Sequence, residues 1–347
     1  MKIAGFDIGG ANTDLAIIDF DTDGDMGNIH VDYCYLPMWE KKDELSHSLL
    51  KLLGDELNDI DAVGVCMTAE LVDAYQTKRE GVLDILKKVK NTFSVPLGFV
   101  GLEGILKPSQ VFKDPLKVAA ANWIATSQIA AIMDSDCILV DVGSTTTDII
   151  PIKNGSECAK GRSDLERLGT GELVYTGTLR SNVATITDKV PLDEGWFRVS
   201  SELFAISADV HNVLGNINPK DYICDTPDRA GKTSEDSMRR IARIICGDLD
   251  ILSKSDILSI CKYLHHKQAS NIAEAIHEVG DIEFMERVVA TGLGMNVLAS
   301  PAAQMARMNV VTMDEFLTPD ECVVAPAVGT ALMMEEFLHD QDSLPLD

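Results

Sequence analysis

The sequence predicts an α/β fold in which one unit is built twice and the second copy carries a helical insert. Two stretches lead to this prediction: FDIGGANTDLAII near the amino terminus and VDVGSTTTDIIPI in the middle of the chain share one order of acid, glycine and threonine. Each stretch opens an alternation of strand-like and helix-like segments, which indicates an internal duplication. Helical periodicity over about 200–280 interrupts the second copy and predicts the insert.

The composition permits two cores and excludes several classes of partner. The chain has 347 residues, of which 46% are hydrophobic, and this is enough for two domains. The first twenty residues alternate as strand, turn and strand, and polar residues interrupt the apolar stretches, so neither a secretory signal nor a membrane span is expected. The formal net charge of −25 argues against nucleic acid or an anionic membrane as a partner, because either needs a cationic face.

The eight cysteines are scattered and form no C-x-x-C pair. This spacing favours reduced, buried thiols in a cytoplasmic protein over disulfides or a zinc site.

Periodicity predicts the elements of the first copy in order. Period-2 or β-branched runs indicate strands and helical spacing indicates helices. The expected elements are strands at 2–8, 13–20 and 28–36, a helix at 41–57, a strand at 61–68, a helix at 81–93, a strand at 96–101 and a long helix at 114–133, with Pro115 in its first turn.

The second copy repeats the pattern from 137 and adds the insert. Its expected elements are a strand-turn-strand at 137–152, helices at 200–215, 234–250 and 254–280, a strand at 284–292, a helix at 295–308, a strand at 309–313 and a helix at 323–338. His265 and His266 are expected to face solvent. We therefore predict a first lobe at 1–115, a second lobe at 116–335 with the insert at about 200–280, and a C-terminal helix at 322–338 that packs back on the first lobe.

The repeated turn has the composition of an anion-binding site. In each copy an aspartate ends an apolar strand and a tight glycine turn follows. Glycine permits positive φ and close approach of a ligand, and successive N–H groups in such a turn form an anion nest. The predicted pyrophosphate cradle is Gly9, Gly10, Asn12, Thr13, Gly143, Ser144, Thr145 and Thr146.

The two aspartates before the turns, Asp7 and Asp141, are predicted to bind Mg²⁺, because a carboxylate repels phosphate unless a metal lies between them. The alternative is two plain hairpins, with glycine set by turn geometry and threonine by strand propensity. Repetition in matching register favours phosphate binding.

A third glycine motif follows late in the chain, in VVATGLGMNVLA. Its Gly292 and Gly294 would let a ligand approach the amino end of the next helix, where N–H groups point outward. Close packing of strand and helix is the alternative explanation.

The order of these motifs resembles the sugar-kinase, Hsp70 and actin superfamily. That resemblance implies a duplicated ribonuclease H-like, two-lobe fold with a central cleft that could also hold ATP. The connecting helices of the superfamily would correspond to MTAELVDAY and VVAPAVGTALMM. In the second of these, small residues would permit close helix crossing: Ala325, Ala327, Gly329 and Ala331.

A closer resemblance is to the archaeal and methylotroph branch of the hydantoinase/oxoprolinase proteins. It is carried by YCYLPMWEKKDEL, VGVCMTAELVDAY, AAANWIATS, DVGSTTTDIIPI, RLGTGELVYTGTLRSNV and SADVHNVLG. That branch is tied to methanofuran- and tetrahydromethanopterin-dependent one-carbon metabolism. The resemblance implies two small-molecule substrates, a diphosphate and a phenolic amine conjugate: 5-(aminomethyl)-3-furanmethanol diphosphate would condense with γ-glutamyltyramine and release pyrophosphate. Mg²⁺ would assist, and no ATP would be required.

A base must take the phenol proton in such a reaction. The candidates are Glu70 in MTAEL, Glu172 in GTGEL and Asp148 after the second turn. Helix capping or a solvated face is the alternative for the two glutamates, and orientation of the turn is the alternative for Asp148. Arg162 and Arg180 are candidate partners of phosphate oxygens, with an ordinary surface position as their alternative.

Two other functions share the same motifs. One is an ATP-dependent kinase or amide-bond enzyme of the hydantoinase/oxoprolinase type, which would form ADP. The other is a nucleotide-sensing scaffold of the actin type, which would assemble with concentration. The fold does not choose among them, and the sequence leaves the oligomeric state open, with a homodimer among the alternatives.

Overall fold

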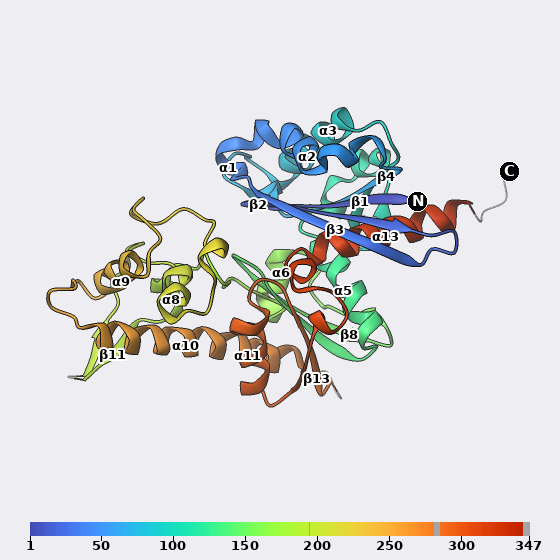
Figure 1. The fold of residues 1–347 in the computed structure, drawn as a ribbon. Coiled ribbons are helices and arrows are strands. Elements are labelled where there is room, and N and C mark those ends of the chain that lie inside the picture. The colour runs from blue at the N-terminus through green and yellow to red at the C-terminus, as the bar shows by residue number, and fades with distance from the viewer. Residues whose placement is uncertain (194, 281–284, 343–347) are drawn as a thin grey trace. The chain divides into compact units, whose positions relative to one another are not determined.

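The computed structural model describes residues 1–193, 195–280 and 285–342 (Figure 1). The chain divides into two compact units. Unit 1 comprises Met1–Asp136, Ile152–Asp164 and Asp314–Asp347, and unit 2 comprises Cys137–Pro151 and Leu165–Met313. The predicted strand at 284–292 begins at a residue outside the described part, and its remainder is described below.

Unit 1 contains a six-stranded sheet in the order β3-β2-β1-β4-β5-β6. β1 pairs antiparallel with β2 and parallel with β4, so the amino-terminal strand lies inside the sheet. The predicted strands of this unit are confirmed. Their bounds are β1 (Lys2–Ile8), β2 (Asn12–Phe20), β3 (Met26–Tyr35), β4 (Ala62–Met67) and β5 (Leu97–Gly101), and β6 (Gly104–Leu106) is a further strand that was not predicted.

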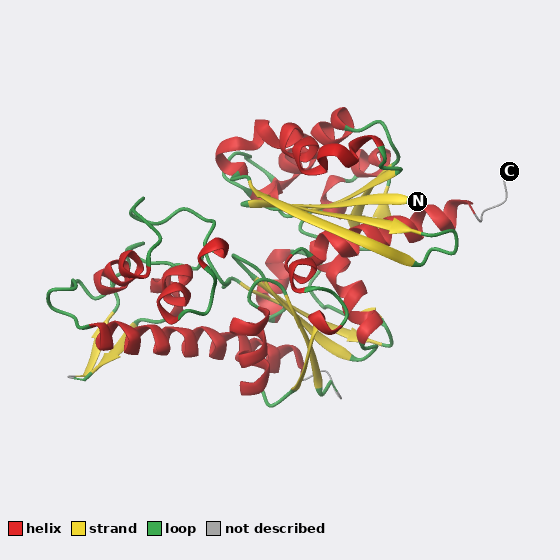
Figure 2. Ribbon diagram, viewed as in Figure 1, coloured by secondary structure: helices red, strands yellow, loops and turns green. Residues whose placement is uncertain are grey.

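Helices cover both faces of this sheet (Figure 1). α2 and α3 pack with one apolar core on one face, which includes Phe6, Leu49 and Val82, whereas α5 and α13 lie on the other. Figure 2 shows the same layers coloured by type of element. The helices of unit 1 are α1 (Met38–Lys41), α2 (Leu45–Leu53), α3 (Lys78–Thr92), α4 (Pro108–Lys113), α5 (Asn122–Met133), α12 (Pro319–Val323) and α13 (Ala325–Asp342).

The C-terminal helix α13 packs so closely that only glycine fits at two contacts. A Cβ at Gly5 of β1 would lie 2.1 Å from the carbonyl oxygen of Ala327, and a Cβ at Gly329 would lie 2.1 Å from that of Ala125. The close crossing predicted for the small residues of this helix is therefore confirmed. Because α5 packs against α13, unit 1 extends to Asp136, whereas the sequence prediction ended the first lobe at 115.

Two predicted helices of this unit are wrong. The segment 114–133 forms a short 3₁₀ helix at Pro115–Val118, turns at Ala120 with a φ of 49°, and starts α5 only at Asn122. Val118 and Trp123 are both buried, and in a continuous helix they would point about 140° apart, so the break lets both reach the core. MTAELVDAY likewise forms only a 3₁₀ turn at Ala69–Leu71.

Unit 2 repeats the topology of unit 1. Its sheet has the order β10-β8-β7-β13-β14, which matches β3-β2-β1-β4-β5 position by position. β13 is parallel to both β7 and β14, and β10 is antiparallel to β8. The predicted duplicated ribonuclease H-like fold is thus confirmed. The strands of this sheet are β7 (Cys137–Val142), β8 (Thr147–Lys153), β10 (Leu173–Val174), β13 (Arg287–Thr291) and β14 (Asn309–Thr312). The short strand β9 (Ser156–Glu157) pairs with the end of β8 from Ile152 on, and both of these pieces belong to unit 1.

The predicted helical insert is confirmed in unit 2. The long helix α10 packs with α8 and α9 around an apolar core that includes Val210, Ile241 and Ile260 (Figure 1). The elements outside the sheet are α6 (Asp164–Thr170), α7 (Val183–Ile186), β11 (Lys189–Leu192), β12 (Gly195–Arg198), α8 (Ser207–Leu214), α9 (Ser234–Arg243), α10 (Lys254–Gly280), a π-helical turn at Met295–Ala299 and α11 (Ser300–Met305).

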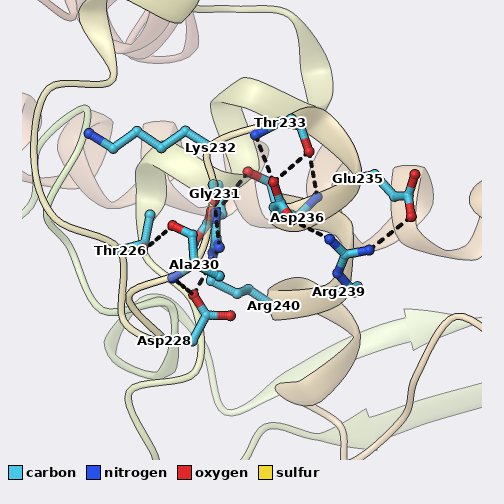
Figure 3. A network of polar contacts seen from close by, with 12 residues as sticks. Thr226, Asp228, Ala230, Gly231, Lys232, Thr233, Glu235, Asp236, Arg239 and Arg240 are labelled. Atoms are coloured by element: carbon cyan, nitrogen blue, oxygen red, sulfur yellow. Dashed lines mark hydrogen bonds and ion pairs between the residues drawn. The ribbon is translucent and has the colours of Figure 1, made fainter.

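A buried arginine holds the insert together. Arg240 is inaccessible to solvent. Its Nε donates to Asp209 Oδ1 at 2.8 Å, and its Nη1 donates to Asp228 Oδ1 and to the carbonyl oxygen of Gly231, each at 3.0 Å. Figure 3 shows Asp228, Gly231 and Arg240 within the polar network of this region. Because two carboxylates and a carbonyl oxygen surround the guanidinium group, the charge of Arg240 can be buried.

Among the residues that the structure describes, no helix has both the length and the apolar character needed to cross a bilayer. Within the same residues the cysteines form no disulfide.

Candidate functional site

The turn between β1 and β2 leaves two amide donors without a described acceptor, whereas its carbonyl groups accept hydrogen bonds. Gly9 N donates to Asn12 O at 2.9 Å and closes the turn. The carbonyl oxygens of Gly10 and Ala11 accept from backbone amides that follow β3, at 2.9 and 2.8 Å. The amides of Gly10 and Ala11 donate to no acceptor in the described part of the chain. The turn therefore offers N–H groups to an external anion.

The turn between β7 and β8 has the same construction. Gly143 N donates to Thr146 O at 3.0 Å. The carbonyl oxygen of Ser144 accepts from two backbone amides of residues 179 and 180, at 3.0 and 2.9 Å. The amides of Ser144 and Thr145 find no acceptor among the described residues. Both copies thus leave two backbone amides without an acceptor among the described residues.

The segment 176–181 packs against the second turn and donates hydrogen bonds to its carbonyl oxygens. Thr178 N donates to Gly143 O at 2.9 Å, and a Cβ at Gly177 would lie 2.6 Å from Thr145 N. Arg180 Nη1 reaches the Thr145 hydroxyl at 3.4 Å, so the structure brings this candidate arginine to the turn. Gly177 and Thr178 were missed as site residues. The sequence showed only that TGTLRS is rich in glycine and polar residues, because the contact is tertiary.

The two predicted metal-binding aspartates end the central strands beside the turns. Asp7 is 7% exposed and Asp141 is 8% exposed. The described residues contain no group of three or more His, Cys, Asp or Glu side chains that could hold a metal. Mg²⁺ is commonly bound by one or two carboxylates together with substrate phosphates, so each of these aspartates by itself fits a metal held jointly with a diphosphate.

The Gly-x-Gly motif lies against Asp141 and the second turn. Gly292 has a φ of +84°, and a Cβ there would lie 2.3 Å from Asp141 Oδ1. Gly294 N donates to Val142 O at 2.8 Å, and a Cβ at Gly294 would lie 2.5 Å from the hydroxyl oxygen of Thr178. Unit 2 therefore gathers its aspartate, its turn and this motif in one place.

The prediction that the turn glycines adopt a positive φ is wrong. Neither Gly9, Gly10 nor Gly143 has a positive φ, whereas Gly292 does. At Gly9 the constraint is space, because a Cβ would lie 2.8 Å from the Asn12 carbonyl oxygen that closes the turn. A Cβ at Gly143 would make an ordinary contact of 3.6 Å.

Glu70 is buried on the segment that borders the first turn. Thr68 N, at one end of this segment, donates to Ile8 O at 3.0 Å. Val72, at the other end, lies 3.2 Å from the position of a Cβ on Gly10. Glu70 Oε2 has no hydrogen-bond partner in the described residues, and burial raises the pKa of this carboxyl to about 7. Neither a solvated face nor a helix cap describes this residue.

Glu172 and Asp148 lie together in unit 2 and are held by protein groups. Arg167 donates to Asp148 Oδ1, and its Nη2 also donates to the carbonyl oxygen of Glu172 at 3.0 Å. Glu172 Oε2 accepts from the Thr170 hydroxyl at 2.7 Å. Glu172 is buried, so the solvated-face alternative is wrong for it too. Glu70 is the better candidate base, because its Oε2 accepts no hydrogen bond in the described residues and burial raises its pKa to about 7.

Arg162 has the surface position given as its alternative, whereas His265 differs from expectation. Arg162 lies in unit 1, where it donates to Glu157 Oε1 and to Leu102 O at 2.7 and 2.9 Å. His265 is half-buried rather than fully exposed, because its Nε2 lies 2.7 Å from Val297 O and its ring packs against that of His211. His266 is exposed, as expected.

Each unit thus holds its own set of candidate residues. Unit 1 holds Asp7, Gly9, Gly10, Asn12, Thr13 and Glu70, and unit 2 holds Asp141, Gly143, Ser144, Thr145, Thr146, Asp148, Glu172, Gly292 and Gly294. Binding of one diphosphate by both sets stays a prediction.

Sequence comparison finds relatives along nearly the whole chain. A profile described as hydantoinase/oxoprolinase matches residues 61–337. A protein of Methanocaldococcus jannaschii is 38% identical over 340 residues, which cover 97% of this chain and 99% of the relative. A protein of Methanococcus vannielii is 33% identical over 210 residues, which cover 60% and 94% of the two chains. Both relatives are called (4-{4-[2-(gamma-L-glutamylamino)ethyl]phenoxymethyl}furan-2-yl)methanamine synthase.

Solved structures share the fold at low identity. A nucleotide-free acetone carboxylase structure matches with a TM-score of 0.63 and 12% identity, over 95% of this chain and 70% of that chain. The activator of 2-hydroxyisocaproyl-CoA dehydratase from Clostridium difficile matches with a TM-score of 0.50 and 11% identity, over 100% of both chains. These likenesses establish the architecture alone.

Proposed function

The chain belongs to the hydantoinase/oxoprolinase family, and within it we propose that the chain is a transferase of the 2.5.1 type, which transfers an alkyl or aryl group. Its substrates are 5-(aminomethyl)-3-furanmethanol diphosphate and γ-glutamyltyramine, and pyrophosphate leaves. The reaction belongs to methanofuran biosynthesis in the cytoplasm of an archaeon.

The compound in the name of the two relatives supports this reaction. It contains a phenoxymethyl bridge between a benzene ring and a furan. Forming that bridge requires a phenol oxygen to attack a carbon attached to the furan while another group leaves that carbon. The furan oxygen donates electrons toward this carbon, so departure of the leaving group can run ahead of attack.

The outward N–H groups of the two turns carry the proposal that the leaving group is a diphosphate. Negative charge grows on the leaving oxygen as its bond to carbon breaks, and fixed donors aimed at this charge stabilise the transition state. Gly10 and Ala11 supply such donors in one unit, and Ser144 and Thr145 supply them in the other. Mg²⁺, bound through Asp7 and Asp141, would neutralise the phosphate oxygens.

Glu70 is the proposed base. The bond between the furfuryl carbon and the diphosphate oxygen breaks, the ether bond to the phenol oxygen forms, and the phenol proton passes to the Glu70 carboxylate. A buried carboxyl with a pKa of about 7 is suited to accept a proton near neutral pH.

The test supplies the purified chain with Mg²⁺, both substrates and no ATP, and measures pyrophosphate and ether. Equal amounts of both products support the proposal. No ether with the furan diphosphate, together with ADP formation when ATP is supplied, would support the kinase alternative instead.

A variant extends this test to the site. Asp141→Asn should lower turnover at least about 100-fold, since it removes a ligand charge next to the developing anion. Asp55→Asn, at an exposed aspartate, is the control and should be unchanged. Near-normal turnover of Asp141→Asn would remove Asp141 from the metal role.

A further inference from the structure

The ion pair beside Glu70 has no role in the reaction proposed above. Lys78 Nζ lies 2.9 Å from Asp164 Oδ2 and 3.6 Å from Glu70 Oε1. The closer contact is a hydrogen bond to Asp164, so the ammonium charge is shared between two carboxylates. The three residues form a cluster within unit 1.

The cluster runs from the interior to the surface. Glu70 is 1% exposed, whereas the side chains of Lys78 and Asp164 are 26% and 27% exposed. The buried carboxyl therefore lies under a partly solvated ion pair. A cation near a buried carboxyl favours its charged form, and a second anion opposes it.

Local structure fixes Lys78 over Glu70. The Thr77 hydroxyl accepts from Glu80 N at 3.2 Å and caps α3, which makes Lys78 the first residue of the helix. One turn later, a Cβ at Gly81 would lie 2.3 Å from the carbonyl oxygen of Glu70. Only glycine permits this approach, and it places the start of α3 directly on the segment that carries Glu70.

We propose that Lys78 and Asp164 are positioning residues with opposite electrostatic effects on Glu70. The proposal rests on the function proposed above, because Glu70 matters as the base of that reaction. Lys78 favours the carboxylate that accepts a proton, and Asp164 weakens this effect by repulsion and by taking the shorter contact with the ammonium group. The charged groups that act on Glu70 come from two segments, Lys78 from α3 and Asp164 from the end of 152–164.

The pKa of Glu70 responds to burial and to both neighbouring charges in the directions that this proposal requires. Burial raises the pKa of Glu70, Lys78 lowers it and Asp164 raises it. For Lys78, burial lowers the pKa, but the two carboxylates outweigh burial and raise it overall. The lysine therefore stays charged while Glu70 titrates.

The experiment uses the full chain and two substitutions with opposite expected effects. Lys78→Gln should move the titration midpoint of Glu70 upward by about one pH unit, and Asp164→Asn should move it downward. The midpoint is read by carboxyl ¹³C NMR of glutamate-labelled protein, with the Glu70 signal assigned by its loss in Glu70→Gln. The acid limb of the pH–rate profile should move in the same directions.

Controls separate electrostatics from damage to the fold. Lys78→Arg keeps the cation and should restore the midpoint. Lys88→Gln removes a lysine of the same helix that pairs with Asp84 at 2.6 Å, and should leave the midpoint of Glu70 unchanged.

Opposite movements support the proposal, whereas unchanged midpoints or movement in one direction for both variants would overturn it. Because NMR needs no turnover, opposite movements in a protein without ether formation would contradict the proposed function and leave the electrostatic pair established.

Discussion

Replacement of the buried Glu70 by glutamine should make the protein more stable at alkaline pH and less active. Glutamine keeps the shape of the side chain and removes its charge. Because the carboxyl is almost fully buried, its ionisation is opposed in the folded protein, and its pKa is raised from an ordinary 4.5 to about 7. The folded chain therefore binds this proton more tightly than the unfolded chain does.

The size of the stability change follows from the difference between the pKa of Glu70 in the folded and in the unfolded chain. For a raised carboxyl pKa, the stabilisation by protonation is complete below about pH 4.5 and is lost as pH rises through 7. The whole loss is about 3 kcal/mol, and the part between pH 5.5 and pH 8 is about 2 kcal/mol. Glu70→Gln has no such loss, so its free energy of unfolding should gain about 2 kcal/mol on the wild type over this interval.

Urea unfolding measures this gain. For each protein the free energy of unfolding is determined at both pH values, and its change with pH is then compared between the wild type and Glu70→Gln. Both values lie above the isoelectric point of about 4.5, which limits precipitation. Effects of the amide that do not depend on pH cancel. Parallel pH dependences of the two proteins would refute the assignment of a raised pKa to Glu70. The same variant should lose about 10²–10⁴-fold in turnover if the carboxylate is the base.

Three further substitutions test the packing described above. Gly177→Ala should weaken pyrophosphate binding at least about tenfold, because its Cβ would lie 2.6 Å from the backbone of the second turn. Isothermal titration calorimetry measures the affinity for pyrophosphate. Gly169→Ala is the control, because a Cβ there would meet no atom within 4 Å. Arg240→Met should lower the free energy of unfolding by about 3–5 kcal/mol, because Asp209 stays buried without its cation, and full stability in urea would contradict the pairing. Gly5→Ala should lower the Tm, because its Cβ would lie 2.1 Å from a backbone oxygen of α13, and an unchanged Tm by calorimetry would contradict that contact.

The duplicated hairpins could be predicted because their signal is local. Strand, turn and strand are adjacent in the chain, and the order of Asp7, Gly9 and Thr13 returns at Asp141, Gly143 and Thr147. The pairing register of such a hairpin depends on its own residues. The same locality explains why helix α10 could be predicted, since it is a long stretch of helical periodicity.

Local sequence patterns do not reveal residues that act through tertiary contacts. Lys78 lies before the helix predicted at 81–93, and its place beside Glu70 depends on the packing of Gly81. Gly177 lies far along the chain from the turn that it supports. The break at Ala120 was missed because each half of the segment has good helical composition, whereas burial of both Val118 and Trp123 favours a turn between them.

The order in which unit 1 is assembled from the chain has a consequence for its biosynthesis. A ribosome makes the central strand β1 more than three hundred residues before α13. Until then the surface around Gly5 that receives Ala327 stays uncovered, while every residue of unit 2 has already been translated. We expect unit 2 to complete its fold before unit 1 on the nascent polypeptide, and β1 to gain its contact with α13 only after that.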